Sequence, residues 1–411
     1  MSSKLLRPVI TLRQGREASL KRRHPWVFSG AIADRRGTLK AGCLVDVESK
    51  DGKFLGSGHW GTRSIAVRVL SFEKVVDEQN LLSEKLESAV LLRRELGLIG
   101  SRETTGFRLI HGEGDGVPGL VIDIYGDTAV VQCHSAGMWR LRESLQALIV
   151  GRSELGVSRV VFRLVEAQVE AEESDDETEA ESESTQPVAV APVEREPEAQ
   201  VVTFSENGLR FLADVSSGQK TGFFLDQRAS RLRIKEYARG RHVLNAFSYT
   251  GAFSVYSFAG GAESVCSVDA SKSAIDLCRQ NVVLNFAQAS HRFEVADCFS
   301  YLDQIPDTFD LIVLDPPAFA KHQRAVQRAM RGYETINALA LKKIRPGGIL
   351  ATFSCSQLVS RELFRDAVLR ASIAADRRVR IIEHFHQAPC HPTNIFHPEG
   401  EYLKGFALYV D

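Results

Sequence analysis

Apolar and polar positions alternate with two different periods along the second half of this 411-residue chain. Short apolar runs rich in Val, Ile and Leu predict strands that are buried on both faces. Such runs lie at residues 243–245, 264–268, 293–295, 311–314, 348–353 and 405–409. Between them, apolar residues recur with helical spacing, for example over 271–285 and 332–343. This order predicts a doubly wound α/β domain over residues 201–411.

The first 165 residues follow another pattern. Period-two alternation over 44–48, a hairpin signal at Asp51-Gly52, and short runs at 54–59 and 65–70 predict a small β domain over 1–75. Residues 76–165 predict an α+β middle domain. Its expected parts are a helix over 80–98, tight glycine-rich turns over 107–119, strands at 120–123 and 129–132, and a helix over 139–150.

Charge is distributed unevenly along the chain. Residues 166–198 hold thirteen acids and one base, a local charge of −12, which leaves +11 on the other residues. The stretch 166–200 has no aromatic residue, so we interpret it as an acidic disordered insertion or linker. The first 75 residues carry a net +9, and a basic body of this kind indicates a polyanionic partner.

The sequence also indicates a compartment. No segment approaches the roughly 18 uninterrupted apolar residues of a membrane span, and residues 1–8 lack the apolar core of a signal peptide. The seven cysteines are odd in number and none has C-x-x-C spacing, which argues against a disulfide framework or a zinc site. We therefore expect a cytoplasmic protein without a membrane partner or a metal.

Acidic residues and a tight turn follow the predicted strands of the α/β domain. The carboxyl ends of parallel strands form its binding crevice. Asp269 lies 18 residues after Gly251, where such domains accept hydrogen bonds from ribose hydroxyls, and Ser271 can begin the next helix. Asp297 repeats the pattern and could face an adenine amino group. The alternatives are an ordinary turn between strand and helix at residues 245–253, and a helix-capping role for Asp269.

Asp315-Pro316-Pro317 and Cys355 each stand at the end of an apolar run. The prolines stiffen the turn that carries the Asp315 carboxylate. C5 of a pyrimidine is a poor nucleophile until a thiolate adds at C6, so a carboxylate and a thiol beside a nucleotide-type cofactor suggest methyl transfer to a pyrimidine carbon. The alternative is that Cys355 is a packed thiol. Cys298 is a weaker candidate.

Two basic segments are candidates for contact with nucleic acid. Lys21, Arg22, Arg23 and His24 run directly into Pro25 and Trp26, so they could grip phosphates beside a stacked base. Lys220, Asp226 and Arg228 lie in a segment ahead of the first strand of the α/β domain and could frame the entrance for the substrate. The alternatives are a solvated charged surface and a solvated helix start.

Together these motifs resemble the bacterial large-subunit ribosomal RNA (cytosine-C5) methyltransferases that carry an N-terminal PUA domain. The resemblance covers nearly the whole chain except about 166–200. The motifs that carry it are the following: residues 22–30 (RRHPWVFSG), 112–119 (GEGDGVPG), 220–228 (KTGFFLDQR), 245–251 (NAFSYTG), 315–317 (DPP), 353–356 (FSCS) and 402–406 (YLKGF).

The resemblance implies a Rossmann-like class I methyltransferase domain preceded by a β-barrel-like PUA domain. It also implies S-adenosylmethionine as cofactor, ribosomal RNA as partner and often a homodimer. It assigns Cys355 as the nucleophile and Asp315 as the residue that holds the base and the cofactor end. The cofactor contacts that it implies are Phe247, Ser248, Tyr249, Thr250, Gly251, Asp269, Ser271, Asp297 and Asp315.

The chain departs from the family at one position of the site. Family members usually carry Lys after Asp-Pro-Pro, where this chain has Ala318, and Lys321 is a possible substitute. Two other functions remain open on the residues alone. One is methylation of a base nitrogen, guanine N7 or adenine N6, which needs no cysteine. The other is an RNA-binding assembly factor without turnover.

Overall fold

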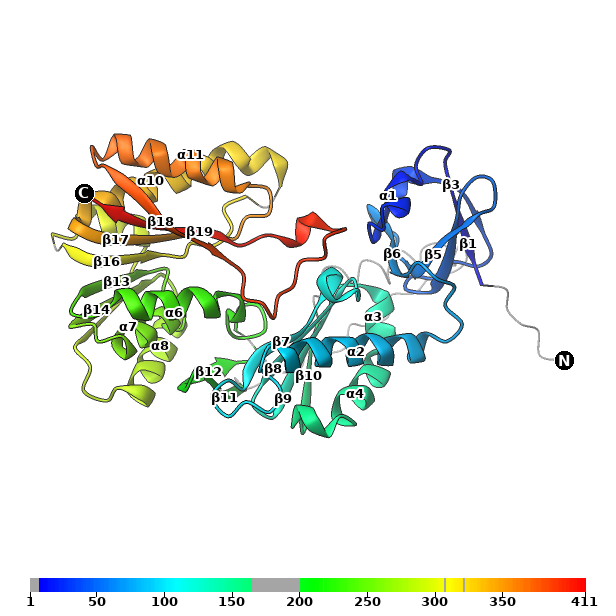
Figure 1. Ribbon diagram of the computed structural model, residues 1–411, viewed down its shortest axis with the longest axis horizontal. Helices are drawn as coiled ribbons and strands as arrows, with labels where there is room; N and C mark the ends of the chain where they lie inside the picture. The colour runs from blue at the N-terminus through cyan, green and yellow to red at the C-terminus, as the bar shows by residue number, and fades with distance from the viewer. Residues whose placement is uncertain (1–6, 165–199, 217, 307, 321) are drawn as a thin grey trace, which may run out of the picture. The chain divides into compact units, whose positions relative to one another are not determined.

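The computed structural model describes residues 7–164, 200–216, 218–306, 308–320 and 322–411 (Figure 1). The acidic stretch predicted over 166–200 and Lys321 therefore fall outside the described residues, apart from Gln200. The chain forms two compact units. The first contains residues up to 202 with 214–222 and 390–400, and the second contains 203–213, 223–389 and 401–411.

The first unit begins with a six-stranded sheet in the order β2-β6-β5-β4-β1-β3. Alternate residues of these strands, such as Ile10, Val45, Val47 and Val67, point into one buried cluster, as their period-two pattern predicts. The elements are β1 (Val9–Leu12), α1 (Ala18–Lys21), β2 (Trp26–Phe28), η1 (Ser29–Ala31), β3 (Ile32–Arg36), β4 (Leu44–Glu48), β5 (Phe54–Trp60) and β6 (Ile65–Ser71).

The rest of the first unit is built on a four-stranded sheet in the order β10-β9-β8-β7. The helix expected over 139–150 is two helices that meet at Leu141, and the glycine-rich stretch begins with a strand. The elements are α2 (Glu78–Glu95), β7 (Gly106–His111), η2 (Gly112–Asp115), β8 (Leu120–Tyr125), β9 (Thr128–Cys133), α3 (Ala136–Arg140), α4 (Arg142–Val150), η3 (Ser153–Leu155) and β10 (Arg159–Leu164).

Two segments beyond residue 201 belong to the first unit, which differs from the domain boundary predicted above. Arg93 is fully buried, forms an ion pair with Asp115 and donates to the carbonyl of Cys390 at 2.8 Å. Thr221 donates to Asp123 at 2.6 Å. Removal of one partner of a buried, hydrogen-bonded charge strongly destabilises a protein. These contacts therefore hold 214–222 and 390–400 to the rest of the first unit.

The second unit carries a seven-stranded sheet in the order β15-β14-β13-β16-β17-β19-β18 (Figure 1). The strands β13 to β17 are parallel, and β19 inserts antiparallel beside β17. The strands are β13 (His242–Ala246), β14 (Ser264–Asp269), β15 (His291–Val295), β16 (Phe309–Leu314), β17 (Ile344–Ser354), β18 (Val379–His386) and β19 (Lys404–Val410). A separate hairpin, β11 (Val201–Glu206) and β12 (Leu209–Asp214), precedes this sheet.

Helices cover both faces of this sheet, as the doubly buried strands predict. Leu311 and Val313 of β16 pack with α6 and α7, whereas Ile312 and Leu314 pack with α9, α10 and α11. The predicted doubly wound α/β fold is thereby confirmed. The helices of the second unit are η4 (Leu225–Gln227), α6 (Arg228–Tyr237), α7 (Ala252–Ala259), α8 (Lys272–Asn285), α9 (Cys298–Gln304), η5 (Gln323–Ala325), α10 (Val326–Lys343) and α11 (Arg361–Ala374). The short helix η6 (Pro398–Gly400) belongs to the segment 390–400 of the first unit.

Helix length and composition also bear on membrane contact. Among the described residues, no helix combines the length and the apolar character that crossing a bilayer requires.

Candidate active site

Four parallel strands of the second unit end at the same level. Ala246 pairs with Val268 on one side and with Leu314 on the other, and Leu314 pairs with Thr352. The residues that follow these strands therefore emerge along one edge of the sheet, where α/β domains bind their ligands. This edge collects the loop 247–251, Asp269, the Asp315 turn and Cys355.

The loop after β13 adopts a constrained conformation. Phe247, Tyr249 and Gly251 all have positive φ, at 59°, 47° and 77°. Positive φ in a non-glycine residue costs of order 1 kcal/mol and persists where the surroundings enforce it. Ser248 donates its backbone N–H to the Val268 carbonyl at 2.9 Å, which ties the loop to the end of β14.

Asp269 organises both segments beside it. One carboxylate oxygen accepts the backbone N–H of Tyr249 and the other accepts that of Ser271, both at 2.9 Å. Ser271, not Asp269, is the N-cap of α8, because its hydroxyl accepts from the Ala274 N–H. The capping alternative for Asp269 is therefore wrong. Each carboxylate oxygen keeps a second lone pair for a ligand hydroxyl.

Asp297 has a structural task that the sequence left unassigned. It is the N-cap of α9, and its carboxylate accepts the backbone N–H of Ser300 at 2.9 Å. The side chain is exposed at the same sheet edge. A contact with adenine stays a prediction, because capping alone already accounts for an acid at this position.

The loop 247–251 carries buried hydroxyl groups that could form hydrogen bonds with a polar cofactor. Ser248 and Thr250 are buried, yet neither hydroxyl has a hydrogen-bond partner in the described part of the chain. A buried hydroxyl without a partner costs about 1–3 kcal/mol, so such atoms point to a ligand. These hydroxyls and the Asp269 carboxylate fit the ribose and amino acid groups of S-adenosylmethionine.

Gly251 is a position where the loop tolerates no side chain. A Cβ there would lie 2.2 Å from the Cys278 sulfur, and φ is +77°. Overpacking and positive φ together predict that Gly251→Ala lowers the free energy of unfolding by about 2–4 kcal/mol. We expect a lower melting temperature and weaker cofactor binding by calorimetry.

Gly240→Ala is the matched control for this prediction. Gly240 also has positive φ, +65°, but has open space where a Cβ would lie. Its substitution introduces the strain of a positive φ without a steric clash, so it should lower the free energy of unfolding by only about 1 kcal/mol. Equal melting temperatures for the two variants would contradict the steric argument.

Asp315 is held by a residue to which the sequence analysis gave no role. The amide nitrogen of Gln227 donates to the Asp315 carboxylate at 3.0 Å, and Gln227 is itself buried. The side chain of Asp315 is half-buried at the sheet edge. Ala318 is also half-buried and offers no polar side-chain group there.

Cys355 and Cys298 differ sharply in environment. Cys355 is half-buried, and its sulfur lies 3.9 Å from the Pro316 carbonyl, so the two motifs predicted to share a site do so. Cys298 is buried and accepts the backbone N–H of Phe247 at 3.2 Å. Burial raises the pKa of the Cys298 thiol to about 12. Cys298 is therefore a packed thiol that supports the loop.

A buried network surrounds Cys355. Tyr333 bonds to Ser354 and to Ser356, both at 2.9 Å, and these serines flank Cys355. Antiparallel pairing places Lys404 opposite Ser354. The Lys404 ammonium donates to the carbonyls of Ser356 and Val359, both at 2.7 Å.

Lys404 also affects Cys355 electrostatically. Burial lowers the pKa of Lys404 to about 8, and the charge of Cys355 acts in the opposite direction. An ammonium so placed stabilises a thiolate. The sequence motif 402–406 contains this lysine but gives no sign of that role.

The basic residues predicted to contact RNA have different settings. Lys21, Arg22 and Arg23 are exposed in the first unit. The Nε2 atom of His24 lies 3.4 Å from a carboxylate oxygen of Glu399, and His397 lies beside them. Among the described residues, these three form a group that could hold a metal ion. Lys220 is exposed. Arg228, which was predicted to frame the entrance for the substrate, begins α6 and is only 8% exposed, so its burial argues against a contact with RNA.

Comparisons with known families match both units. A family model described as S-adenosylmethionine-dependent methyltransferase matches residues 188–393, and a PUA-like domain model matches 10–72. Ribosomal RNA large subunit methyltransferase I from Vibrio cholerae is 40% identical over 98% of this chain and 99% of its own length. The Erwinia tasmaniensis protein of the same name is 39% identical over the same shares.

A solved structure supports the fold. A candidate S-adenosylmethionine-dependent methyltransferase from Streptococcus mutans superposes with a TM-score of 0.77 and 22% identity. The match covers 98% of this chain and 99% of that protein. At this identity the likeness establishes the fold alone.

Proposed function

Because this chain belongs to the ribosomal RNA large subunit methyltransferase I family of S-adenosylmethionine-dependent enzymes, we propose that it methylates C5 of a cytosine in large-subunit ribosomal RNA. One observation carries the proposal. Cys355 is half-buried, and its sulfur lies 3.9 Å from the carbonyl of Pro316, beside the Asp315 carboxylate turn. Methylation of a base nitrogen has no use for such a thiol.

Cys355 acts as the nucleophile in the proposed reaction. Its thiolate forms a bond to C6 of the cytosine, which makes C5 electron-rich. Bound S-adenosylmethionine supplies the methyl group from its sulfonium. Loss of the C5 proton then restores the ring and expels the thiolate. The target base must leave its stack to reach Cys355.

Neighbouring residues hold the reacting groups. Asp315, oriented by Gln227, accepts a hydrogen bond from the exocyclic amino group of cytosine. The Lys404 ammonium stabilises the thiolate before addition and after expulsion. Phe247, Ser248, Tyr249, Thr250 and Gly251 would hold the methionine and ribose portions of the cofactor, Asp269 and Ser271 the ribose hydroxyls, and Asp297 the adenine amino group.

The exposed bases of the first unit provide sequence-independent attraction for RNA. Lys21, Arg22 and Arg23 are exposed beside β2, and Lys220 is exposed in the segment 214–222. Contacts of this kind with phosphates position an RNA without reading its sequence. Arg228 has no part in this surface because it is buried.

Tritium-labelled methyl transfer to unmodified large-subunit RNA tests the proposal. Digestion to nucleosides should give labelled 5-methylcytidine as the product. Labelled 7-methylguanosine or N6-methyladenosine would overturn the cytosine-C5 assignment in favour of nitrogen methylation. No label in the RNA, with cofactor binding retained, would instead support an assembly factor without turnover.

A further inference from the structure

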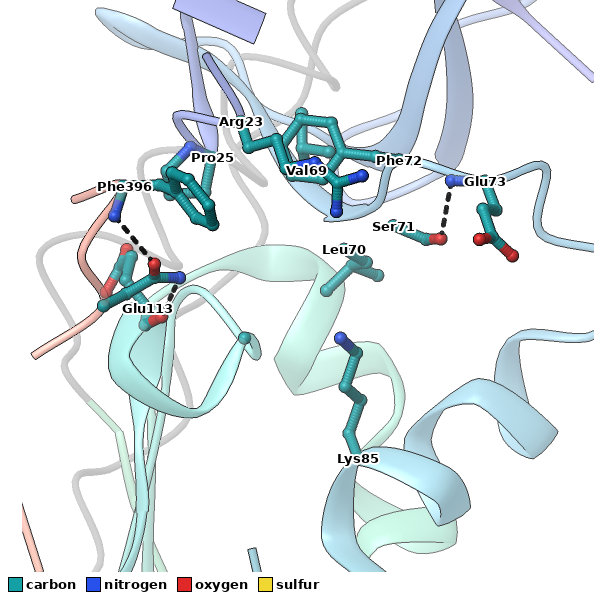
Figure 2. Close-up of a pocket in the computed structure, with 12 residues that line it drawn as sticks. Arg23, Pro25, Val69, Leu70, Ser71, Phe72, Glu73, Lys85, Glu113 and Phe396 are labelled. Carbon is teal, nitrogen blue, oxygen red and sulfur yellow. Dashed lines mark hydrogen bonds between the residues drawn. The ribbon is translucent and has the colours of Figure 1, made fainter. Parts of the chain in front are cut away.

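A pocket of about 310 Å³ lies in the first unit, which contains no part of the active site described above (Figure 2). Its walls come from segments far apart in sequence. Arg23 and Pro25 precede β2, Phe72 follows β6, Lys85 belongs to α2, and Phe396 comes from the segment 390–400. The volume is at the lower end of the range for small-molecule sites and suits one nucleotide.

Arg23 stands where the backbone prefers glycine. It has a φ of 61° directly after the C-cap of α1. Its N–H donates to the Leu20 carbonyl at 2.8 Å, and the His24 N–H donates to the Ser19 carbonyl at 3.0 Å. This is the bonding of a Schellman motif, whose left-handed residue is usually Gly. The backbone of an arginine is strained in this left-handed conformation. The hydrogen bonds of the motif do not involve its side chain, so folding does not require an arginine here.

Lys85 is a partly desolvated cation. Burial lowers the pKa of its ammonium group, and the charge of Glu84 acts more weakly in the opposite direction. In the described parts of the chain, neither Lys85 nor Arg23 makes a side-chain hydrogen bond or an ion pair. The contact found for Arg23 is with the Phe72 ring, 5.9 Å from the centroid. Figure 2 shows both cationic groups directed into the same pocket. An anion between them would satisfy both.

The rest of the lining suits a nucleotide better than a simple anion. Phe396 is 47% exposed, and an exposed aromatic face beside cations is what single-stranded RNA stacks on. Glu73 and Glu113 also border the pocket, and Glu113 already accepts the Trp26 indole N–H at 2.9 Å. Two carboxylates disfavour a free anion, but they can accept hydrogen bonds from base amino groups.

We propose that this pocket is a second RNA subsite, which holds one phosphodiester group between Arg23 and Lys85 and one unstacked base against Phe396. The proposal rests on the proposed function in one respect, namely that RNA is the substrate. The subsite positions the strand and takes no part in the transfer of the methyl group.

Two charge variants test the subsite in the full chain. Arg23→Gly removes the guanidinium and relieves the positive φ, so the protein should fold at least as well as wild type. Lys85→Met keeps most of the aliphatic stem. Each should raise the dissociation constant for a large-subunit RNA fragment about tenfold, measured by fluorescence anisotropy. The slope of log affinity against log salt should fall by about 0.7–0.9 for each lost phosphate contact.

Phe396→Ala separates stacking from charge. It should weaken RNA binding to a similar degree while leaving the salt slope unchanged, because a ring releases no counterions. Lys50→Met is the matched control, since Lys50 is an exposed lysine of the same unit outside the pocket. In the labelled-methyl assay, the three pocket variants should raise KM for RNA and leave kcat within about twofold.

Each outcome decides between named alternatives. RNA affinity and salt slope equal to wild type in both charge variants would overturn the subsite. Binding of cytidine 5′-monophosphate or inorganic phosphate that these variants abolish, with RNA affinity intact, would assign the pocket to a free ligand and also overturn it. A wild-type product other than 5-methylcytidine would refute the proposed function. The subsite would still be judged separately, by the RNA affinities and salt slopes of the variants.

Discussion

Cys355→Ala should lose methyl transfer by about 10³-fold or more while it keeps cofactor and RNA binding. The thiol is the group that makes C5 reactive in the proposed mechanism, and no other described residue at this sheet edge offers a sulfur nucleophile, because Cys298 is buried. Single-turnover labelled-methyl transfer measures the loss. The melting temperature should change little, since the side chain is half-exposed.

Cys43→Ala is the matched control for the nucleophile. Cys43 is the other half-exposed free cysteine among the described residues, and it lies in the first unit. Its loss should leave the rate within about twofold. A Cys355→Ala enzyme with full turnover would make Cys355 a packed thiol, the alternative that the sequence left open.

Lys404→Met should lower kcat by about 100-fold at neutral pH. The change removes the charge that stabilises the Cys355 thiolate and leaves the carbonyls of Ser356 and Val359 without their donor. Lys342→Met is the control, because Lys342 is exposed on α10 and should have no effect.

The pH profile distinguishes an electrostatic role of Lys404 from a structural one. The pKa of Lys404 is lowered by burial to about 8, so the group is charged below that pH and neutral above it. Wild-type kcat should therefore decline as pH rises through about 8. Lys404→Met should lack this decline, and its rate should rise toward alkaline pH as more thiolate forms. A uniform loss at every pH would mean that Lys404 only holds the loop.

The fold of the second unit was predictable because its strands are buried on both faces. Runs such as Leu311–Leu314 need apolar residues on both sides of the sheet, and this gives a strong sequence signal. The strand β18 (Val379–His386) lies at the sheet edge and mixes exposed and charged residues, so its pattern gave no comparable signal.

The site was predictable wherever a residue directly follows a strand. Asp269, Asp315 and Cys355 belong to this class, because parallel strands bring their carboxyl ends to one edge. Lys404 lies at the start of an antiparallel strand, and only the pairing of β19 with β17 brings it beside Cys355. Gln227 reaches Asp315 across 88 positions of sequence, and no periodic pattern reports such a contact.

Local sequence does not report the burial of single residues. Arg228 was expected to frame the entrance for the substrate, but it begins α6 and is only 8% exposed, although arginine is mostly exposed in proteins. Asp297 stays a predicted adenine contact, and the structure adds a capping hydrogen bond from the Ser300 N–H, which the sequence did not separate from a ligand role. Acids at strand ends serve ligands and helix caps alike, so their spacing cannot separate the two roles.

The most direct measurement is covalent trapping with RNA that carries 5-fluorocytidine at the target. The fluorine prevents loss of a proton from C5, so the thiolate cannot be expelled after methyl transfer. Mass spectrometry of the digested complex should place the nucleotide on the peptide that contains Cys355, with none trapped by Cys355→Ala. An enzyme that methylates the unsubstituted RNA but forms no adduct, or an adduct on another cysteine, would contradict the account.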